Sequence, residues 1–247
     1  MCYRYSVPGP DLLVKRFSAL FLENVSFTQQ YHASSFDLPM LPVITNENSQ
    51  QIQLFAWGLI PFWVKEKKTA EEIRLKTMNA RAESIFDKPS FRHAAGQQHC
   101  LVLADGFFEW QEYQGRNYPY YIRLKSHEPF AMAGLWDVWK NPQTSKVFQT
   151  YTVITTRANP LMAQIHNKKK RMPVILPKER ERDWISKSLT RQDAEAFLVP
   201  FDEQLMEAFT ISRLITSKQR NPNVPAVSQP FSYPELVARS GQKNLFE

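Results

Sequence analysis

The second residue of the chain is a cysteine, and its place beside the amino terminus gives it a chemistry that an internal cysteine lacks. Once Met1 is removed, Cys2 carries a thiol and an α-amine on neighbouring carbon atoms. The amine can condense with an aldehyde to an imine, and the thiolate can then close on the imine carbon to form a thiazolidine. Both groups have reference pKa values of about 8, so each has a reactive fraction at neutral pH.

Three polar residues farther along the chain could assist that chemistry. Glu109 lies among aromatic residues in the segment Asp105–Trp110, where desolvation would raise the pKa of its carboxyl group and suit it to proton transfer. His166 can act as an acid or a base near neutral pH. Asn79 could orient an amine or a hydroxyl group, because an amide hydrogen-bonds in fixed directions. The ordinary alternative for Glu109 is an exposed strand residue, for His166 a structural histidine, and for Asn79 a turn residue.

Basic residues near these positions could hold the phosphates of a nucleic acid. Arginine pairs with two phosphate oxygens at once, whereas lysine acts as a point charge. The candidates are Arg4, Arg81 and Arg171, with Lys168, Lys169 and Lys170 as weaker ones. An ion pair with Glu83 is the alternative for Arg81, and a solvated loop is the alternative for the lysine run.

Aromatic and proline side chains could contact the bases of the same nucleic acid. The candidates are Trp57, Trp63, Pro39 and Pro42, together with Phe62. A tryptophan that stacks on an unpaired base contributes about 1–3 kcal/mol, and a proline offers an apolar surface for packing. Burial in the core is the alternative for the aromatic rings, and we predict it for Trp110 and Trp136.

Length and composition fit one large domain with a polyanionic partner. The chain has 247 residues, of which 43% are hydrophobic and 22% charged, and its net charge is +7. These values are typical of a globular protein with a sizeable core. The basic balance favours nucleic acid as a partner, with solubility alone as the alternative explanation.

Several other classes of protein are not indicated. No apolar run approaches the roughly 18–20 residues that a membrane span needs, and we recognise no secretory signal at the amino terminus. Cys2 and Cys100 are the two cysteines, and neither belongs to a metal-binding pattern. We therefore expect no disulfide framework, no metal and no cofactor, and a cytoplasmic location.

Hydrophobic periodicity predicts short elements around a sheet-rich core. Strands are expected at residues 51–57, 101–103, 120–124, 129–133 and 148–155. Helices are expected at residues 11–21, 178–186 and 191–198, the last with a capping box between Thr190 and Asp193, and a helical turn at residues 80–86. A loop is expected at residues 39–42. Residues 1–220 form the predicted domain, and residues 221–247, with four prolines, form an irregular tail packed on it or extending from it.

The motifs that hold the candidate residues follow one another in the order seen in a known family. They are Met1–Arg4, Trp57–Trp63, Asn79–Glu83, Ala104–Trp110, Gly134–Asp137, Thr155–Asn159, Ile165–His166 and Arg171–Leu176. In this series the chain resembles the SRAP family, the SOS-response-associated peptidase-like proteins that process abasic sites in DNA.

The resemblance implies a fold, a partner and a set of roles. The fold would be α+β and β-rich, a single domain of antiparallel sheets curled into a barrel-like core with surrounding helices. Catalytic or binding roles would fall to Cys2, Asn79, Glu109 and His166. The partner would be single-stranded DNA with abasic sites, whose open-chain sugar carries an aldehyde. We expect a monomer that associates with the nucleoid when it acts on DNA.

Two segments depart from the family pattern. The family places the arginine of its Arg-Met-Pro motif about two residues after the histidine, whereas here residues 167–170, Asn-Lys-Lys-Lys, separate His166 from Arg171. The loop is therefore longer and more basic. Where many members have an Asn-x-Ala-Pro sequence, this chain has Phe36–Pro39, and only the prolines of that loop are kept as candidates.

Three functions are compatible with these residues. The leading one is a covalent trap that binds abasic sites and forms a thiazolidine cross-link through Cys2, with an abasic lyase activity through the imine. The second is a thiol peptidase in which His166 is the base and Asn79 the orienting residue, with self-removal of Met1 as its minimal form. The third is a non-catalytic reader of modified DNA bases. Lesion trapping, peptide cleavage, and binding that survives the loss of Cys2 would distinguish them.

Overall fold

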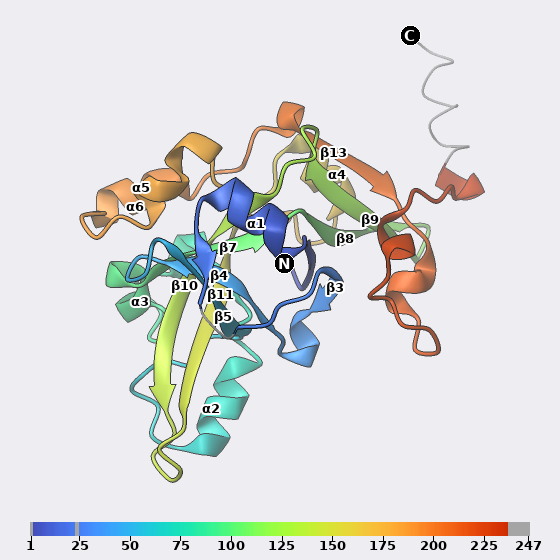
Figure 1. Cartoon of the computed structure of the whole chain (residues 1–247). Helices are drawn as coiled ribbons and strands as arrows, with labels where there is room; N and C mark the ends of the chain where they lie inside the picture. Colours follow the sequence, from blue (N-terminus) through green and yellow to red (C-terminus); the bar gives the residue numbers. More distant parts are fainter. Residues whose placement is uncertain (1, 23–24, 237–247) are drawn as a thin grey trace.

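The computed structural model describes residues 2–22 and 25–236 and builds them around a small closed barrel (Figure 1). Antiparallel pairings join the barrel strands in the order β5, β4, β7, β10, β11, and a parallel pairing between β11 and β5 closes the ring. The barrel strands are β4 (Met40–Thr45), β5 (Gln51–Trp57), β7 (His99–Ala104), β10 (Phe130–Lys140) and β11 (Val147–Arg157). Three short strands add to it: β2 (Leu20–Phe21), β6 (Asn79–Arg81) and β12 (Arg171–Pro173).

A second, antiparallel sheet continues from the barrel and carries the start of the chain. Its order is β13, β9, β8, β1, β3. Its strands are β1 (Arg4–Val7), β3 (Gln30–Ser34), β8 (Gly106–Tyr113), β9 (Arg116–Leu124) and β13 (Met206–Thr210). One residue, Asp105, separates β7 from β8, so the chain passes directly from the barrel into this sheet.

Aromatic side chains tie the two sheets together. The ring of Tyr5, from β1, lies 4.8 Å from the ring of Trp57, from β5, and its hydroxyl lies 2.6 Å from the hydroxyl of Tyr151 in β11. Trp57 donates its indole N–H to the carbonyl of Met78 at 2.8 Å. Because buried hydroxyl and indole groups need hydrogen-bond partners, these contacts fix where β1 sits against the barrel.

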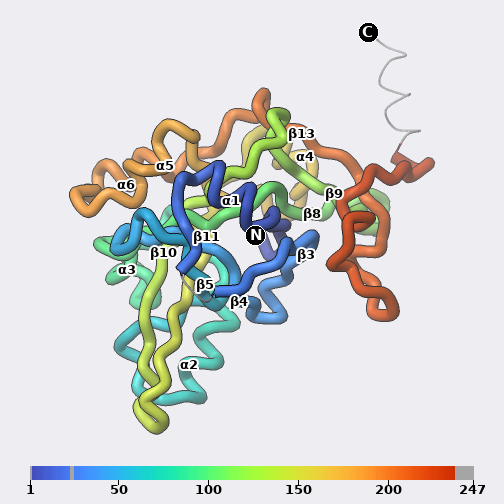
Figure 2. Tube along the Cα trace, viewed as in Figure 1, coloured from blue at the N-terminus to red at the C-terminus, as the bar shows by residue number. Residues whose placement is uncertain are grey.

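Helices and turns cover the outside of the strands. Ala70 and Ile73 of α2 belong to a small apolar cluster with Trp139 and Phe148 of the β10–β11 hairpin, beside which α2 runs (Figure 2). The helices are α1 (Pro10–Phe17), α2 (Lys67–Arg74), α3 (Arg92–Gln97), α4 (Pro160–Ile165), α5 (Glu181–Trp184) and α6 (Arg191–Phe197). The 3₁₀ turns are Ser35–Asp37, Ala82–Ser84, Lys178–Arg180, Glu203–Leu205, Arg213–Thr216 and Pro225–Ser228.

Residues 211–236 pack across one face of the second sheet, from β9 to β3 (Figure 2). Ile211 donates its N–H to the carbonyl of Pro119 at 3.0 Å and bridges to Pro230. Val227 is buried in a cluster with Phe108 and Tyr121. The predicted tail begins inside this segment, and its residues 237–247 lie outside the described part of the chain. The division into a domain and a tail stays a prediction.

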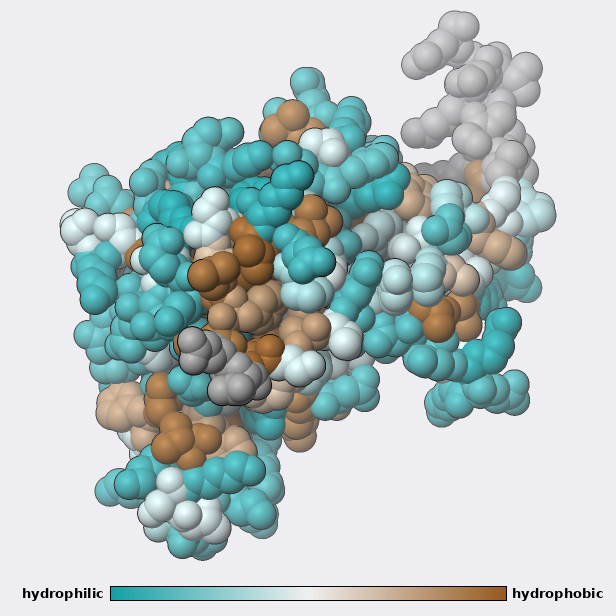
Figure 3. All heavy atoms as spheres, viewed as in Figure 1, coloured by the Kyte–Doolittle hydropathy of each residue, from teal (hydrophilic) through white to brown (hydrophobic). Residues whose placement is uncertain are grey.

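The surface is mostly hydrophilic on the face seen in Figure 3, with a smaller apolar patch over α1 and the segment that follows it. Leu12, Leu20 and Leu22 are among the exposed apolar side chains of this region. Over the described ranges, the helices are all too short or too polar to traverse a lipid bilayer.

The fold class predicted from the sequence is confirmed. The strand predicted at residues 51–57 matches β5, and the other predicted strands lie within or overlap β7, β9, β10 and β11. The capping box of α6 is also confirmed, because Thr190 and Asp193 each accept from the other's backbone N–H. The sequence did not predict the parallel pairing that closes the barrel.

Two local predictions are wrong, and a third is right only in part. The helix expected at residues 11–21 ends at Phe17, because Ser18 takes a left-handed conformation with φ of 50°. The loop expected at residues 39–42 is mostly strand, since β4 begins at Met40. Pro42 is tolerated there because β7 pairs with β4 only from Val43 onward. The helical turn expected at residues 80–86 is β6 followed by a 3₁₀ turn.

The junction between β7 and β8 needs a residue without a side chain. A Cβ atom at Gly106 would lie 2.2 Å from the ring and hydroxyl of Tyr121. That hydroxyl lies 2.9 Å from the Ser6 hydroxyl, which in turn donates to the Asp105 carboxylate at 2.5 Å. The close approach of Tyr121 therefore joins β1, β8 and β9 at one point.

Gly106→Ala should destabilise the protein by about 1–3 kcal/mol, because the added methyl group forces Tyr121 out of this contact. Gly96→Ala is the matched control, since a Cβ atom there meets open space in α3 and should stabilise the helix by up to about 1 kcal/mol. Urea unfolding of both variants measures the difference. Equal stability of the two variants would contradict the packing described for Gly106.

Candidate functional site

Cys2 lies just before β1, in the middle of the second sheet. β1 pairs with β3 on one side and with β8 on the other, and Tyr5 is opposite Phe107 of β8. The Cys2 side chain is fully buried, and its thiol donates to the carbonyl of Arg4 at 3.7 Å. Burial raises the pKa of the thiol, and the nearby carboxylate of Glu109 raises it further. Residue 1, whose removal we expect, is outside the described residues.

Glu109 comes from the neighbouring strand β8 and faces the same region. Its side chain is 4% exposed, and the residue is opposite Tyr120 of β9 in the ladder. Burial raises the pKa of its carboxyl group from 4.5 to about 7, and the positive charge of Lys169 opposes part of that rise. A carboxyl group with this pKa exchanges protons at neutral pH, as a general acid or base must.

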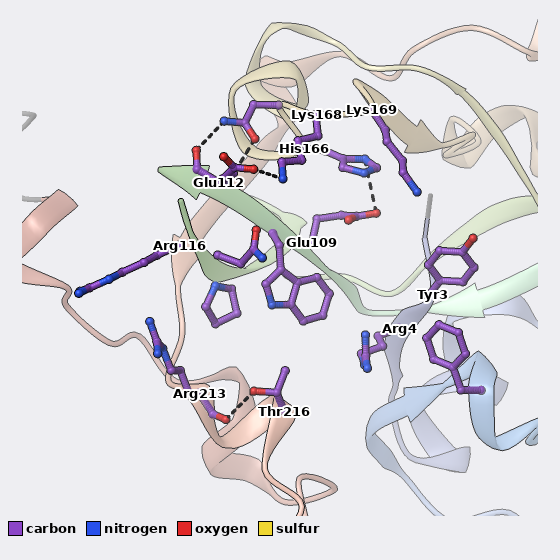
Figure 4. Close-up of a pocket in the computed structure, with 15 residues that line it drawn as sticks. Tyr3, Arg4, Glu109, Glu112, Arg116, His166, Lys168, Lys169, Arg213 and Thr216 are labelled. Carbon is purple, nitrogen blue, oxygen red and sulfur yellow. Dashed lines mark hydrogen bonds and ion pairs between the residues drawn. The ribbon is translucent and has the colours of Figure 1, made fainter. Parts of the chain in front are cut away.

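His166 follows the last residue of α4, and its ring points toward Glu109 (Figure 4). Nδ1 donates to the carbonyl of Arg171 at 2.9 Å and lies 3.7 Å from Oε1 of Glu109. The pKa of His166 is lowered to about 4, chiefly by burial, and the charges of Lys169 and Arg171 contribute to that lowering. His166 is therefore neutral at pH 7. With the proton on Nδ1, Nε2 is left as an acceptor.

The longer loop after His166 folds back on itself and keeps Arg171 beside the histidine. Lys170 has a φ of 49°, and its N–H donates to the carbonyl of His166 at 2.8 Å. Arg171 forms an ion pair with Glu83 at 2.7 Å and donates to the oxygens of Thr155. The sequence offered an ion pair between Arg81 and Glu83, but Arg171 is the partner seen for Glu83, and Arg81 is exposed.

A pocket of about 630 Å³ opens above these residues (Figure 4). Its walls come from the start of β1, the turn at Ser35–Asp37, β8, the first residues of β9, the loop after His166 and the turn at Arg213–Thr216. Arg4 lies inside it, with its guanidinium carbon 5.0 Å from the ring centroid of Trp110 and 5.5 Å from that of Phe36. Trp110 was predicted in the core, but it is only partly buried and lines this pocket.

The pocket is rich in positive charge. Its cationic side chains are Arg4, Arg116, Lys168, Lys169 and Arg213, against the carboxyl groups of Glu109 and Glu112. Lys168 forms an ion pair with Glu112, so this predicted phosphate ligand already has an anionic partner.

Asn79 is buried in β6, where it pairs with Val153 of β11. Neither its amide nitrogen nor its amide oxygen has a hydrogen-bond partner within the described residues. A buried amide without partners is unfavourable and uncommon, which is typical of a group kept for a ligand. Asn79 is not one of the residues that line the pocket, so its predicted role in orienting the reaction stays a prediction.

None of the residues predicted to contact bases lines the pocket. Trp57 is fully buried between the sheets and offers no ring face to a base, contrary to the prediction. Pro42 is buried within β4 and is likewise unavailable. Pro39 is partly buried and Trp63 is 42% exposed, but neither lines the pocket. No cluster of His, Cys, Asp and Glu side chains in the described ranges is arranged to hold a metal ion.

Residues 1–218 match the sequence profile of a family described as SOS response associated peptidase (SRAP). The chain belongs to the SRAP family. The abasic site processing protein YoqW of Bacillus subtilis (strain 168) is 38% identical over 227 residues, which cover 90% of this chain and 96% of that protein. The abasic site processing protein HMCES of Pongo abelii is 30% identical over 194 residues, covering 67% of this chain and 53% of that protein.

Solved structures agree with this membership. A crystal structure of a protein from Bacteroides thetaiotaomicron superposes with a TM-score of 0.87 and is 36% identical, covering 94% of this chain and 100% of that one. A second, from Bordetella bronchiseptica, has a TM-score of 0.73 and 27% identity and covers 85% of this chain and 100% of that one. The SRAP fold thus extends over nearly the whole described chain.

Sequence reasoning missed several residues of this SRAP pocket. Tyr3 and Trp110 are direct neighbours of predicted site residues, and their motifs could have indicated them. Arg116 and Arg213 carry no such signal. The chain returns beside β9 after β13, and this brings Arg213 to the pocket. A contact between segments so far apart in the sequence leaves no local sequence pattern.

The raised pKa of Glu109 predicts how SRAP stability changes with pH. The folded protein holds the proton of Glu109 more tightly than the unfolded chain does, so wild type loses stability as pH rises from about 4.5 to about 7. Glu109→Gln has no such loss. Relative to wild type, the variant should gain roughly 3 kcal/mol between pH 4.5 and pH 8.

Urea unfolding at a series of pH values measures this gain. Glu72→Gln, at an exposed position of α2, controls for the general effect of the replacement. A stability difference between Glu109→Gln and wild type that does not change with pH would show that Glu109 ionises as freely as an exposed carboxyl group.

Proposed function

We propose that this SRAP protein captures abasic sites in single-stranded DNA as a thiazolidine through Cys2, after Met1 has been removed. The observation that carries the proposal is the burial of Cys2 close enough to Glu109 for the carboxylate to raise the pKa of its thiol, while Glu109 and His166 line a basic pocket. The relatives named abasic site processing proteins support the choice of lesion.

The residues supply each proton transfer that the reaction needs. The Cys2 amine adds to the aldehyde at C1′, and the resulting carbinolamine loses water to give an imine. Glu109, in its protonated form, donates the proton that water departure requires. The thiol then adds to the imine carbon, and the Glu109 carboxylate accepts the thiol proton. His166, which is neutral, acts through Nε2 as a hydrogen-bond acceptor rather than as the acid that opens the sugar.

The depth of the site favours single-stranded DNA. Cys2 and Glu109 are buried, so the sugar has to leave the helical stack before it reaches them. A single strand meets this requirement at the least cost. Arg4 and Arg81 are then available for phosphates, and the ring of Trp110 can stack on a neighbouring base. The protein acts as a monomer at the DNA of the nucleoid.

The geometry gives less support to the alternatives. A thiol peptidase needs a thiolate, but burial and Glu109 raise the pKa of the Cys2 thiol, whose hydrogen bond goes to the carbonyl of Arg4. Peptidase chemistry at Cys2 is therefore disfavoured, and removal of Met1 is the one peptide cleavage that the proposal requires. An abasic lyase would use the same imine, but fast closure by the adjacent thiol competes with strand cleavage. A non-catalytic reader would have no use for a buried carboxyl group beside a thiol.

Cys2→Ala should abolish the heat-stable cross-link to single-stranded DNA that carries one abasic site, because alanine lacks the thiol that closes the ring. Cys100→Ala is the matched control: it removes the other buried cysteine, which lies in β7, and should leave the cross-link in place. Denaturing electrophoresis after heating gives the yield, and intact mass should show condensation with loss of one water.

An added residue before Cys2 should have the same effect as Cys2→Ala. The nitrogen of Cys2 would then be an amide, whose lone pair is delocalised and cannot form an imine. A heat-stable adduct through Cys2 in the extended protein would show that a different bond is made, and the thiazolidine proposal would fall.

Glu109→Gln should slow cross-linking by roughly 10²–10⁴-fold, as the loss of a proton-transfer group does, and His166→Ala should slow it less through the loss of a hydrogen-bond acceptor, each with a smaller effect on DNA affinity. Single-turnover rates at saturating protein separate the two effects. His93→Ala, at an exposed position of α3, is the control for histidine loss. Unchanged rates combined with weaker binding would make both residues binding groups and would contradict the proton transfers proposed above.

A further inference from the structure

The loop between His166 and Arg171 is fixed to the sheet at its first residue. The side-chain oxygen of Asn167 accepts the backbone N–H of Glu112 at 3.1 Å, and its amide nitrogen donates to the backbone carbonyl of Glu112 at 2.8 Å. One side chain thus pairs with β8 as a neighbouring strand would. The loop therefore has a defined position over the pocket.

This anchoring sends the three lysines of the loop in different directions. Lys168 turns back to the Glu112 carboxylate. Lys170 is exposed, adopts the left-handed conformation that closes the loop, and is not among the residues lining the pocket. Lys169 lines the pocket, and Figure 4 shows its side chain extending from the loop toward Glu109 and Tyr3. It forms no ion pair with any residue that the structure describes.

The charge of Lys169 acts on both Glu109 and His166. It lowers the pKa of Glu109 and that of His166, as a cation close to both would. A cation at the mouth of a pocket with no carboxylate partner is available for an anionic ligand. A sugar held at Cys2 within a DNA strand has a phosphate on each side, so one phosphate lies at the rim of the pocket.

We propose that Lys169 binds the DNA phosphate adjacent to the captured sugar, and that the loop between His166 and Arg171 is a substrate-binding element. The inference rests on the proposed function for the identity of the ligand. It rests on the loop geometry for the choice of Lys169 over its neighbours. Lys168 is already paired, and Lys170 faces solvent.

The test uses the full-length protein and a single-stranded oligonucleotide with one tetrahydrofuran residue, an abasic analogue that has no aldehyde and cannot cross-link. Fluorescence anisotropy over a range of salt concentrations gives the slope of log K against log salt. Lys169→Ala should lower the magnitude of that slope by about 0.7, the value for one phosphate contact on a single strand. Lys169→Arg should restore it.

Lys170→Ala is the matched control, because it removes the same charge from the same loop at a position that does not line the pocket. Its slope should equal that of wild type. A wild-type slope in Lys169→Ala, or an equal loss in Lys169→Ala and Lys170→Ala, would overturn the assignment. Because the analogue cannot form an imine, this result is independent of cross-linking: a failure of Cys2 to capture a true abasic site would remove the proposed function alone.

Discussion

The insertion of β1 between β3 and β8 is the constraint on which the site depends. Residues beside a chain terminus usually fray, because little holds them. Here ladders on both sides hold β1, and the hydroxyl contact between Tyr5 and Tyr151 ties it to the barrel. The Ser6 hydroxyl adds contacts to Asp105 and Tyr121. Cys2, next to a strand held in this way, is buried in a fixed position instead of a flexible one.

The same burial sets the proton chemistry. Loss of water disfavours the charged form of any group, so it raises the pKa of Glu109 and lowers that of His166. Both side chains are driven toward their neutral forms. Glu109 can then donate a proton, and His166 can accept a hydrogen bond. Lys169, Arg171 and Arg4 provide the positive field around them, and Lys169 keeps the pKa of Glu109 from rising further. One physical cause thus yields two different roles.

The sequence was informative where local chemistry is distinctive and uninformative where distant segments meet. The order of short motifs predicted the β-rich barrel, and the placement of Cys2, Glu109 and His166 in one region agrees with their motifs. Trp57 shows the limit: its motif indicates importance but does not separate a buried ring from an exposed one. Arg171 shows another, because its partner Glu83 lies 88 residues away, and spacing alone suggested Arg81 instead.

A carboxyl group with a pKa near the working pH serves both halves of the proposed reaction. Imine formation needs a proton donor when water departs, whereas thiol addition needs an acceptor for the thiol proton. With a pKa of about 7, Glu109 is present in both forms at neutral pH, and each step leaves it in the form that the next step uses. An exposed carboxylate would seldom be protonated at neutral pH and could not donate. A carboxyl group that stayed protonated could not accept the thiol proton. The burial of Glu109 lowers the stability of the fold at neutral pH, and the packing of β1 against the barrel offsets that loss.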